Sequence, residues 1–102
     1  MNDVSSGTAP LQAQLDAQCR PTLERRMRLQ FEPAQQAHVL LYPEGMIKLN
    51  RSAGEILARC RGEATLGEIV ADLERAFATS GLEPQVRAFL EQALEKRWVV
   101  LA

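Results

Sequence analysis

The sequence predicts a small α+β domain in which a three-stranded antiparallel meander precedes three helices. Two observations carry this prediction. Residues 26–49 hold three short apolar or alternating stretches separated by proline-containing turns, and residues 52–95 hold three amphipathic stretches with helical spacing. Strands that precede helices in this way are typical of α+β domains rather than of parallel α/β domains.

The size and composition fit one domain. The chain has 102 residues, of which 46% are hydrophobic and 25% charged, and it is small for an enzyme that must also build a deep pocket. We expect the domain to span residues 21–102, and residues 1–20 to form either a tail or a short helix over Thr8–Cys19. Such a helix has only Leu11 and Leu15 on its apolar face. It therefore needs another surface, for example a second copy of the chain in a homodimer.

The sequence also predicts a cellular compartment. The N-terminal residues lack the basic and then apolar pattern of a secretory signal, and no apolar run approaches the ~18 residues that span a bilayer. The two cysteines, Cys19 and Cys60, are too few for a disulfide scaffold. We therefore expect a cytoplasmic protein.

The three strands are predicted from apolar alternation and turn signals. They are expected at Arg26–Phe31, Ala37–Tyr42 and Met46–Leu49. In the first, Met27, Leu29 and Phe31 share one side, and the charged residues between them face water. Between the second and third, Pro43-Glu44-Gly45 fits a type I turn followed by a glycine in the left-handed conformation.

Each predicted helix has a start signal. Asn50 or Ser52 caps the first helix, with Ser52 opening a capping box, and Thr65 opens a second capping box ahead of the second helix. Pro84 stands where a first helical residue is expected in the third helix. The apolar faces expected to be buried contain Ala53, Ile56, Leu57 and Cys60, then Leu66, Ile69, Val70, Leu73 and Phe77, then Val86, Phe89, Leu90, Ala93 and Leu94. The chain closes with Trp98–Leu101, either a short strand or an apolar tail.

Candidate catalytic and metal-binding residues are few. His38 is the one histidine, has no acid or cysteine at ligand spacing, and is interpreted as an exposed or hydrogen-bonded strand residue. Cys19 and Cys60 do not form a CxxC pair, and a zinc site needs about four ligands. Nucleotide-binding and nucleophile-elbow motifs do not occur in the sequence. We therefore expect no catalytic residue, no metal site and no cofactor, and we predict that the protein is not an enzyme.

Three consecutive helices beside a small sheet are winged helix-turn-helix-like, which raises the alternative of a nucleic-acid-binding protein. Charge argues against that alternative. Residues 20–61 carry eight Lys or Arg and four acids, whereas residues 62–95 carry two Arg and seven acids, a net charge of −5. The third helix would be the recognition helix, and it lies in the acidic part of the chain, where phosphates would be repelled.

A strand edge is the remaining candidate for function. In a meander whose strands lie in sequence order, the third strand has one neighbour, and its other side presents unpaired N–H and C=O groups. Met46–Leu49 is short and carries only Lys48 as a charge. An extended peptide could pair with it, or the chain's own helix or tail could cover it. The pattern leaves both alternatives open.

Several motifs then occur together. RLQF ends the first strand, LLYPEG occupies residues 40–45, LN follows at 49–50, C-x-G lies at 60–62 and T-x-x-E-I-V at 65–70. With these motifs the chain resembles the PqqD family over residues 21–101. One small departure is Arg61, because family members commonly have an acidic residue at this position. Residues 1–20 lie outside the pattern.

The resemblance implies a small domain that recognises precursor peptides of ribosomally made natural products. Such a protein would bind the precursor peptide PqqA and present it to the radical SAM enzyme PqqE in pyrroloquinoline quinone (PQQ) biosynthesis, with no catalytic residue or cofactor of its own. An adaptor that contacts only the enzyme is an alternative.

The resemblance also implies where the peptide binds. In related domains the peptide adds as a strand beside the third strand and faces the third helix. Carried onto this chain, the expected peptide contacts are Met46, Ile47, Lys48 and Leu49 on the strand and Arg87, Leu90, Glu91 and Leu94 on the helix. Proline at Ile47 should block pairing if the amide of that residue faces the open edge.

Overall fold

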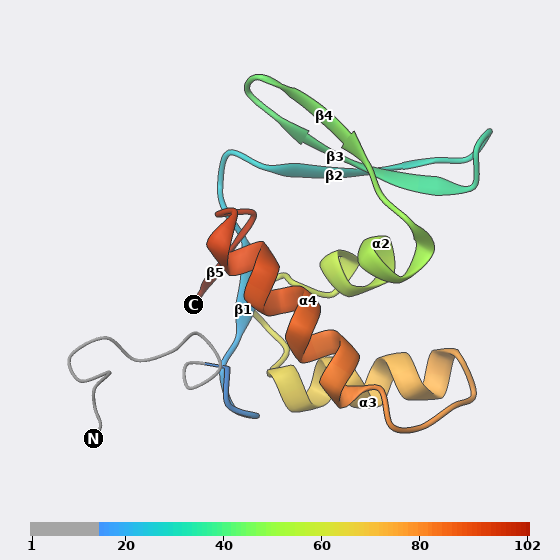
Figure 1. Cartoon of the computed structure of the whole chain (residues 1–102), viewed down its shortest axis with the longest axis vertical. Coiled ribbons are helices and arrows are strands. Elements are labelled where there is room, and N and C mark those ends of the chain that lie inside the picture. The colour runs from blue at the N-terminus through green and yellow to red at the C-terminus, as the bar shows by residue number, and fades with distance from the viewer. Residues whose placement is uncertain (1–14) are drawn as a thin grey trace.

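The computed structural model describes residues 15–102 and confirms the predicted α+β class (Figure 1). A three-stranded antiparallel meander in the order β2-β3-β4 precedes three helices, and two further strands form a second sheet. The elements are β1 (Pro21–Leu23), β2 (Arg28–Glu32), β3 (Ala37–Tyr42), β4 (Gly45–Lys48), α2 (Arg51–Ala58), α3 (Leu66–Ala76), α4 (Glu83–Glu95) and β5 (Val99–Leu101). No helix of the described part is long and apolar enough to cross a membrane.

The turn between β3 and β4 is tighter than the sequence suggested. Tyr42 pairs with Gly45, so only Pro43 and Glu44 form the loop. The expectation that Gly45 adopts the left-handed conformation is wrong, because its φ lies outside that region. As the first residue of β4, Gly45 needs an extended backbone to pair with Tyr42.

Helix α2 starts at Asn50. The side chain of Asn50 accepts a hydrogen bond from the Ala53 amide at 2.8 Å, and the Ser52 hydroxyl donates to the same oxygen at 3.2 Å. The prediction of Asn50 as the cap is confirmed, and the Ser52 capping box is wrong. Leu49 lies between β4 and this cap, and its side chain is buried.

The capping box of α3 forms as predicted. The Glu68 amide donates to the Thr65 hydroxyl at 3.1 Å, and the Thr65 amide donates to the Glu68 carboxylate at 2.8 Å.

An ion pair joins α2 to α3. Arg59 donates through Nε to Asp72 at 2.6 Å and through its terminal nitrogen to Glu55 at 2.9 Å.

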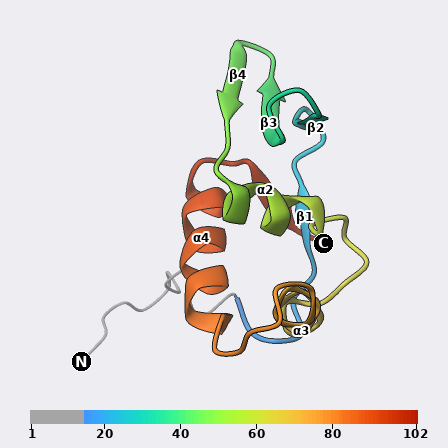
Figure 2. The same ribbon diagram turned by 90° about the vertical axis from the view of Figure 1, so that its right-hand side faces the viewer.

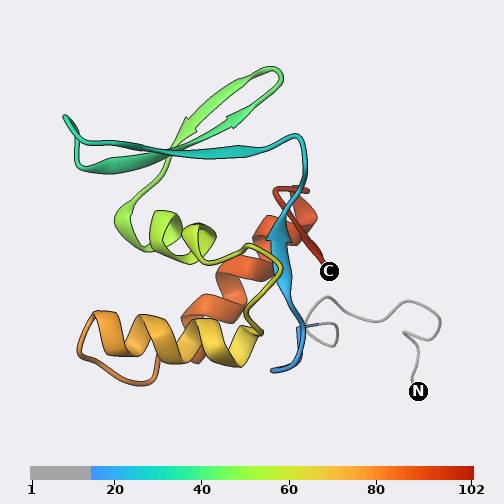
Figure 3. The same cartoon turned by 180° about the vertical axis from the view of Figure 1, so that it is seen from behind.

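The helices cover only one face of the main sheet (Figures 1 and 3). Close approach of α2 to β3 depends on Gly54, because a Cβ on that residue would lie 2.4 Å from Nδ1 of His38. The His38 ring also packs edge-on against Phe31, with ring centroids 5.0 Å apart. The hydrophobic core is formed by Leu15, Leu40, Leu49, Ala53, Ile56, Leu57, Cys60, Leu66, Ile69, Val70, Leu73, Val86, Leu90, Ala93 and Val99.

The second sheet joins the two ends of the described chain. β1 pairs with β5 in antiparallel register, with Pro21 opposite Leu101, and Figure 1 shows the two strands side by side. The Ala102 amide donates to the Arg20 carbonyl at 2.8 Å. The sequence predicted β5 as one of two alternatives but gave no sign of β1, because three residues are too few to show alternation.

Residues 15–20 pack against the domain. Leu15 is fully buried, and the carbonyls of Ala17 and Cys19 accept hydrogen bonds from the first amides of α3, at 3.0 and 2.8 Å. The helix predicted over Thr8–Cys19 lies largely outside the described residues, and its part from residue 15 onward forms a turn rather than a helix. These carbonyls satisfy the unpaired N–H groups of the α3 N-terminus.

Candidate functional site

One side of β4 is open. β4 pairs with β3 alone, and no other strand of residues 15–102 lies beside it. The Leu49 amide donates to the His38 carbonyl at 3.0 Å, and Ile47 lies opposite Leu40. Because hydrogen-bonded and non-hydrogen-bonded pairs alternate in an antiparallel ladder, the Ile47 amide also points towards β3. The N–H and C=O groups of Met46 and Lys48 therefore point outwards.

The four predicted strand contacts divide into two kinds. The Met46 side chain is 64% exposed, and Lys48 is also exposed. Ile47 packs against the core, and Leu49 is buried just beyond the end of β4. Direct access from solvent is therefore greatest at Met46 and Lys48, the residues whose backbone groups face outwards.

The residues predicted on α4 lie elsewhere. Leu90 is fully buried in the core, and Arg87 forms an ion pair with Glu83 one turn earlier. Leu94 lines a separate cleft next to β5. Arg87 and Glu91 each lie two residues from Phe89, which places them about 160° around the helix axis from it. This matters because Phe89, together with Gln85, Val86 and Gln92, is one of the α4 residues that line an open cavity.

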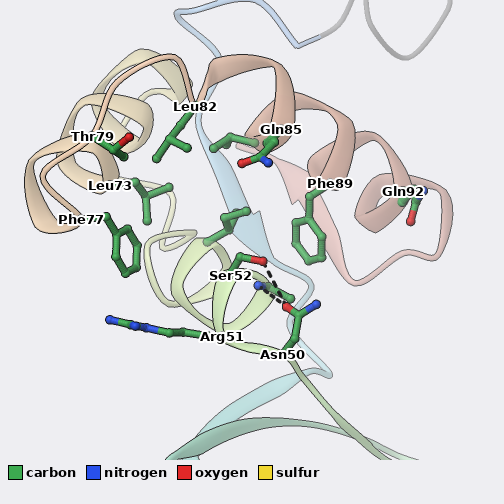
Figure 4. A pocket seen from close by; sticks show the side chains of 13 residues that line it. Asn50, Arg51, Ser52, Leu73, Phe77, Thr79, Leu82, Gln85, Phe89 and Gln92 are labelled. Atoms are coloured by element: carbon green, nitrogen blue, oxygen red, sulfur yellow. Dashed lines mark hydrogen bonds between the residues drawn. The ribbon is translucent and has the colours of Figure 1, made fainter.

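That cavity begins where β4 ends and α2 begins, and it has a volume of about 870 Å³. Figure 4 shows it open between the N-terminus of α2, the C-terminus of α3 and one side of α4. Its apolar surface comes from buried residues on all three helices and from three half-buried residues, Phe77, Leu82 and Phe89. The lining consists of Asn50, Arg51, Ser52, Ala53, Ile56, Leu73, Phe77, Thr79, Leu82, Gln85, Val86, Phe89 and Gln92.

The rim of this cavity is polar. The Arg51 guanidinium lies 4.8 Å from the centre of the Phe77 ring and forms no ion pair with another described residue. Gln85 and Gln92 contribute exposed amides from α4. An apolar side chain that enters this cavity would be buried against apolar residues. The polar or acidic neighbours of that side chain could accept hydrogen bonds from Arg51, Gln85 and Gln92 at the rim.

The described residues include few groups suited to catalysis. Burial raises the pKa of the Cys60 thiol to about 12, and burial, followed by nearby Asp16, also raises the pKa of Cys19. Both thiols are therefore poor nucleophiles at neutral pH. Within residues 15–102 no three His, Cys, Asp or Glu side chains gather as metal ligands do. The geometry suits binding rather than bond-making.

DNA binding through α4 remains disfavoured. Its accessible surface includes Glu83, Glu91 and Glu95, and the first turn of α3 adds the exposed Glu68. These carboxylates would oppose phosphates at the position of a recognition helix.

Comparison with known proteins gives a consistent result. The family model described as coenzyme PQQ synthesis protein D (PqqD) matches residues 37–99. A protein of Stutzerimonas stutzeri named PqqA binding protein is 50% identical over 82 residues, which cover 79% of this chain and 89% of that protein. The protein of the same name from Methylococcus capsulatus is 52% identical over 73 residues, with coverage of 72% and 78%.

Two solved structures share the fold. One is the PqqD truncation of Methylobacterium extorquens PqqCD, described as a functional stand-alone recognition element for ribosomally synthesised and post-translationally modified peptides. It is 28% identical with a TM-score of 0.66, and the match covers 78% of this chain and 87% of that one. The heterocyclase TruD matches at 21% identity and a TM-score of 0.63, over 82% of this chain and 12% of its own; this shows the fold alone.

Sequence reasoning missed the cavity residues on α4 and α3. Phe89 was expected on the buried face with Val86 and Leu90, yet it stays half-buried at the cavity. One signal was present, since Phe89 lies 100° from Leu90 and so at the margin of the apolar stripe. Nothing in the sequence marked Arg51 as a cavity residue, because its position over the Phe77 ring depends on how α2 packs against α3.

Proposed function

Because this chain belongs to the PqqD family, we propose that it binds the precursor peptide PqqA and presents it to the radical SAM enzyme PqqE in PQQ biosynthesis. Relatives named PqqA binding protein, 50% identical or more, support the choice of peptide. The observation that carries the mechanism is an open strand edge, β4, which leads directly into an open apolar cavity.

The peptide adds as a fourth strand beside β4. Its backbone pairs with the outward N–H and C=O groups of Met46 and Lys48, which gives affinity without regard to side chains. Alternate peptide side chains point to opposite sides of the extended sheet. Those on the helix side reach the cavity at its Asn50 end, where an apolar residue is buried against Ile56 and Phe89.

The helical wall of the site is revised accordingly. The proposed α4 contacts are Gln85, Phe89 and Gln92, which line the cavity. Leu90 supports this wall from within the core, where it is inaccessible to a peptide. Arg87, Glu91 and Leu94 remain predicted contacts only for a peptide segment that passes around the far side of α4.

A pair of substitutions at Lys48 tests strand addition. Lys48→Pro removes an outward amide without breaking the bonds to β3, so we expect at least about tenfold weaker binding of synthetic PqqA. Lys48→Gln keeps the amide and is the matched control, expected to bind within about twofold of wild type. Proline at Ile47 is unsuitable, because the amide of Ile47 points towards β3. Isothermal titration calorimetry measures the affinities, and circular dichroism checks the fold.

Amide chemical shifts locate the peptide independently. On titration with PqqA the Met46 and Lys48 amides should shift most within the sheet, together with the Phe89 amide on α4. If PqqA binds and these signals stay in place, strand addition is excluded. An adaptor that contacts only the enzyme would instead capture PqqE while showing no affinity for PqqA.

Two further properties stay predictions. The first is cytoplasmic localisation. The second is a homodimer through the N-terminal segment, of which residues 1–14 lie outside the described part of the chain; light scattering over a concentration series would test it.

A further inference from the structure

The side of the main sheet that points away from the helices is uncovered among the described residues (Figures 1 and 2). Leu29, Leu40 and Ile47 lie side by side and pack against the core. The residues at alternate positions therefore point the other way. We call this surface the outer face; it is formed by Arg28, Gln30, Val39, Leu41, Met46 and Lys48.

The outer face has an apolar centre and a basic rim. The half-buried Leu41 and the 64% exposed Met46 lie opposite each other on β3 and β4, and Val39 beside them is buried with 6% exposure. Arg28 on β2 and Lys48 on β4 flank them, and neither forms an ion pair with another residue of the described range. An apolar centre with charged neighbours is typical of surfaces that bind other proteins.

We propose that the outer face docks the enzyme that receives the peptide, through an enzyme surface with an apolar centre bordered by carboxylates. This inference rests on the proposed function and adds the surface and the chemistry of the contact. A second copy of the chain fits the outer face less well. Two-fold packing would bring Arg28 and Lys48 of one copy close to the same cations of the other.

Strand addition at β4 would enlarge the outer face. Peptide side chains opposite Met46 and Lys48 point to the same side of the sheet as those residues. The alternate side chains point into the helix-side cavity and anchor the peptide. An enzyme seated on the outer face would therefore contact this chain and the free peptide side chains together, and it should bind the peptide-loaded form more tightly than the peptide-free form.

The experiment measures binding of purified PqqE to the fluorescently labelled full chain, with and without saturating synthetic PqqA. Arg28→Gln and Leu41→Gln alter the outer face away from the β4 edge. We expect each to weaken binding of the loaded chain to PqqE about three- to tenfold and to leave PqqA affinity within about twofold. Arg75→Gln removes another exposed cation, from α3, and is the matched control, expected to have no effect on either affinity.

Each outcome separates the two proposals. If Arg28→Gln binds PqqE as wild type does, the outer face is not the docking surface, whereas peptide recognition still stands. If Arg28→Gln weakens PqqA binding as much as PqqE binding, the two surfaces are not separate and the inference fails. If wild type binds no PqqA, the proposed function fails first. Arg28 is exposed on β2, so Arg28→Gln gives a clear reading even if Leu41→Gln proves poorly folded.

Discussion

Substituting Gly54 by alanine tests the contact between α2 and β3. In an ordinary helix interior this change stabilises the protein by about 1 kcal/mol, because glycine has more conformational freedom to lose. Here the new Cβ would lie 2.4 Å from Nδ1 of His38 and 2.9 Å from both Cβ and Cγ of that residue. Favourable contacts between carbon atoms lie near 3.5–4.0 Å.

The size of the effect follows from these opposing contributions. The Cβ and Cγ atoms of His38 belong to the base of the side chain, so rotation of the ring cannot relieve all three contacts. Either α2 or β3 must move, and overpacking of this kind costs about 1–3 kcal/mol. After the helix-propensity gain is subtracted, we expect Gly54→Ala to lower the free energy of unfolding by up to about 2 kcal/mol.

Urea denaturation followed by circular dichroism measures the change, and Gly67→Ala is the matched control. A Cβ at Gly67, in the first turn of α3, would meet nothing nearer than the Ala17 carbonyl at 3.4 Å. That variant should be neutral or slightly stabilised. His38→Ala in the Gly54→Ala background should recover part of the loss, about 0.5–1 kcal/mol of coupling. A Gly54→Ala protein that is more stable than wild type by about 1 kcal/mol, as helix propensity alone predicts, would refute the reasoning.

Three further predictions concern thiols, a carboxylate and a cap. Because Cys60 is buried and its pKa is raised to about 12, Ellman's reagent at pH 8 should leave it unmodified in the native protein and react with it only after denaturation; rapid native modification of Cys60 would contradict the packing. Hydrogen bonds from Arg59, and then Arg75, lower the pKa of Asp72 below 3.8, so its contribution to stability is present above that pH and is lost as pH falls through the lower folded value. Wild type should therefore exceed Asp72→Asn in stability at pH 7 and lose that advantage in acid, whereas a constant difference down to about pH 2 would show that the charge is not responsible. Thr65→Ala should lower the free energy of unfolding by about 1 kcal/mol in the same urea assay, and no loss would mean that the capping box does not stabilise α3.

The fold was most predictable where its signals are local. The α3 helix was predicted fully, because Thr65 and Glu68 mark its start and its apolar residues repeat at helical spacing. β1 was missed because its partner, β5, lies at the other end of the sequence, and a pairing over that separation leaves no local pattern. The cap of α2 was ambiguous for a related reason. Asn50 and Ser52 are both favourable capping residues, and the sequence does not mark where β4 ends.

The candidate site divides in the same way. An open edge at β4 follows from the order of three strands, which the sequence predicts. The helical wall depends on the rotation of α4 about its axis, and this is set by the packing of Val86, Leu90 and Ala93. A shift of one residue turns the helix by 100°, which is the difference between Leu90 and Phe89 at the cavity.

The pairing of β1 with β5 has a consequence for how this domain can be joined to other proteins. Arg20 and Ala102 are hydrogen-bonded neighbours at the ends of β1 and β5, and Figure 1 shows these two strands and the C-terminus beneath the main sheet, away from the β3–β4 turn. A tether attached after Ala102 would therefore leave the β4 edge unobstructed. Such a tether would replace a bimolecular encounter with an intramolecular one, at an effective concentration on the order of millimolar for a short flexible linker.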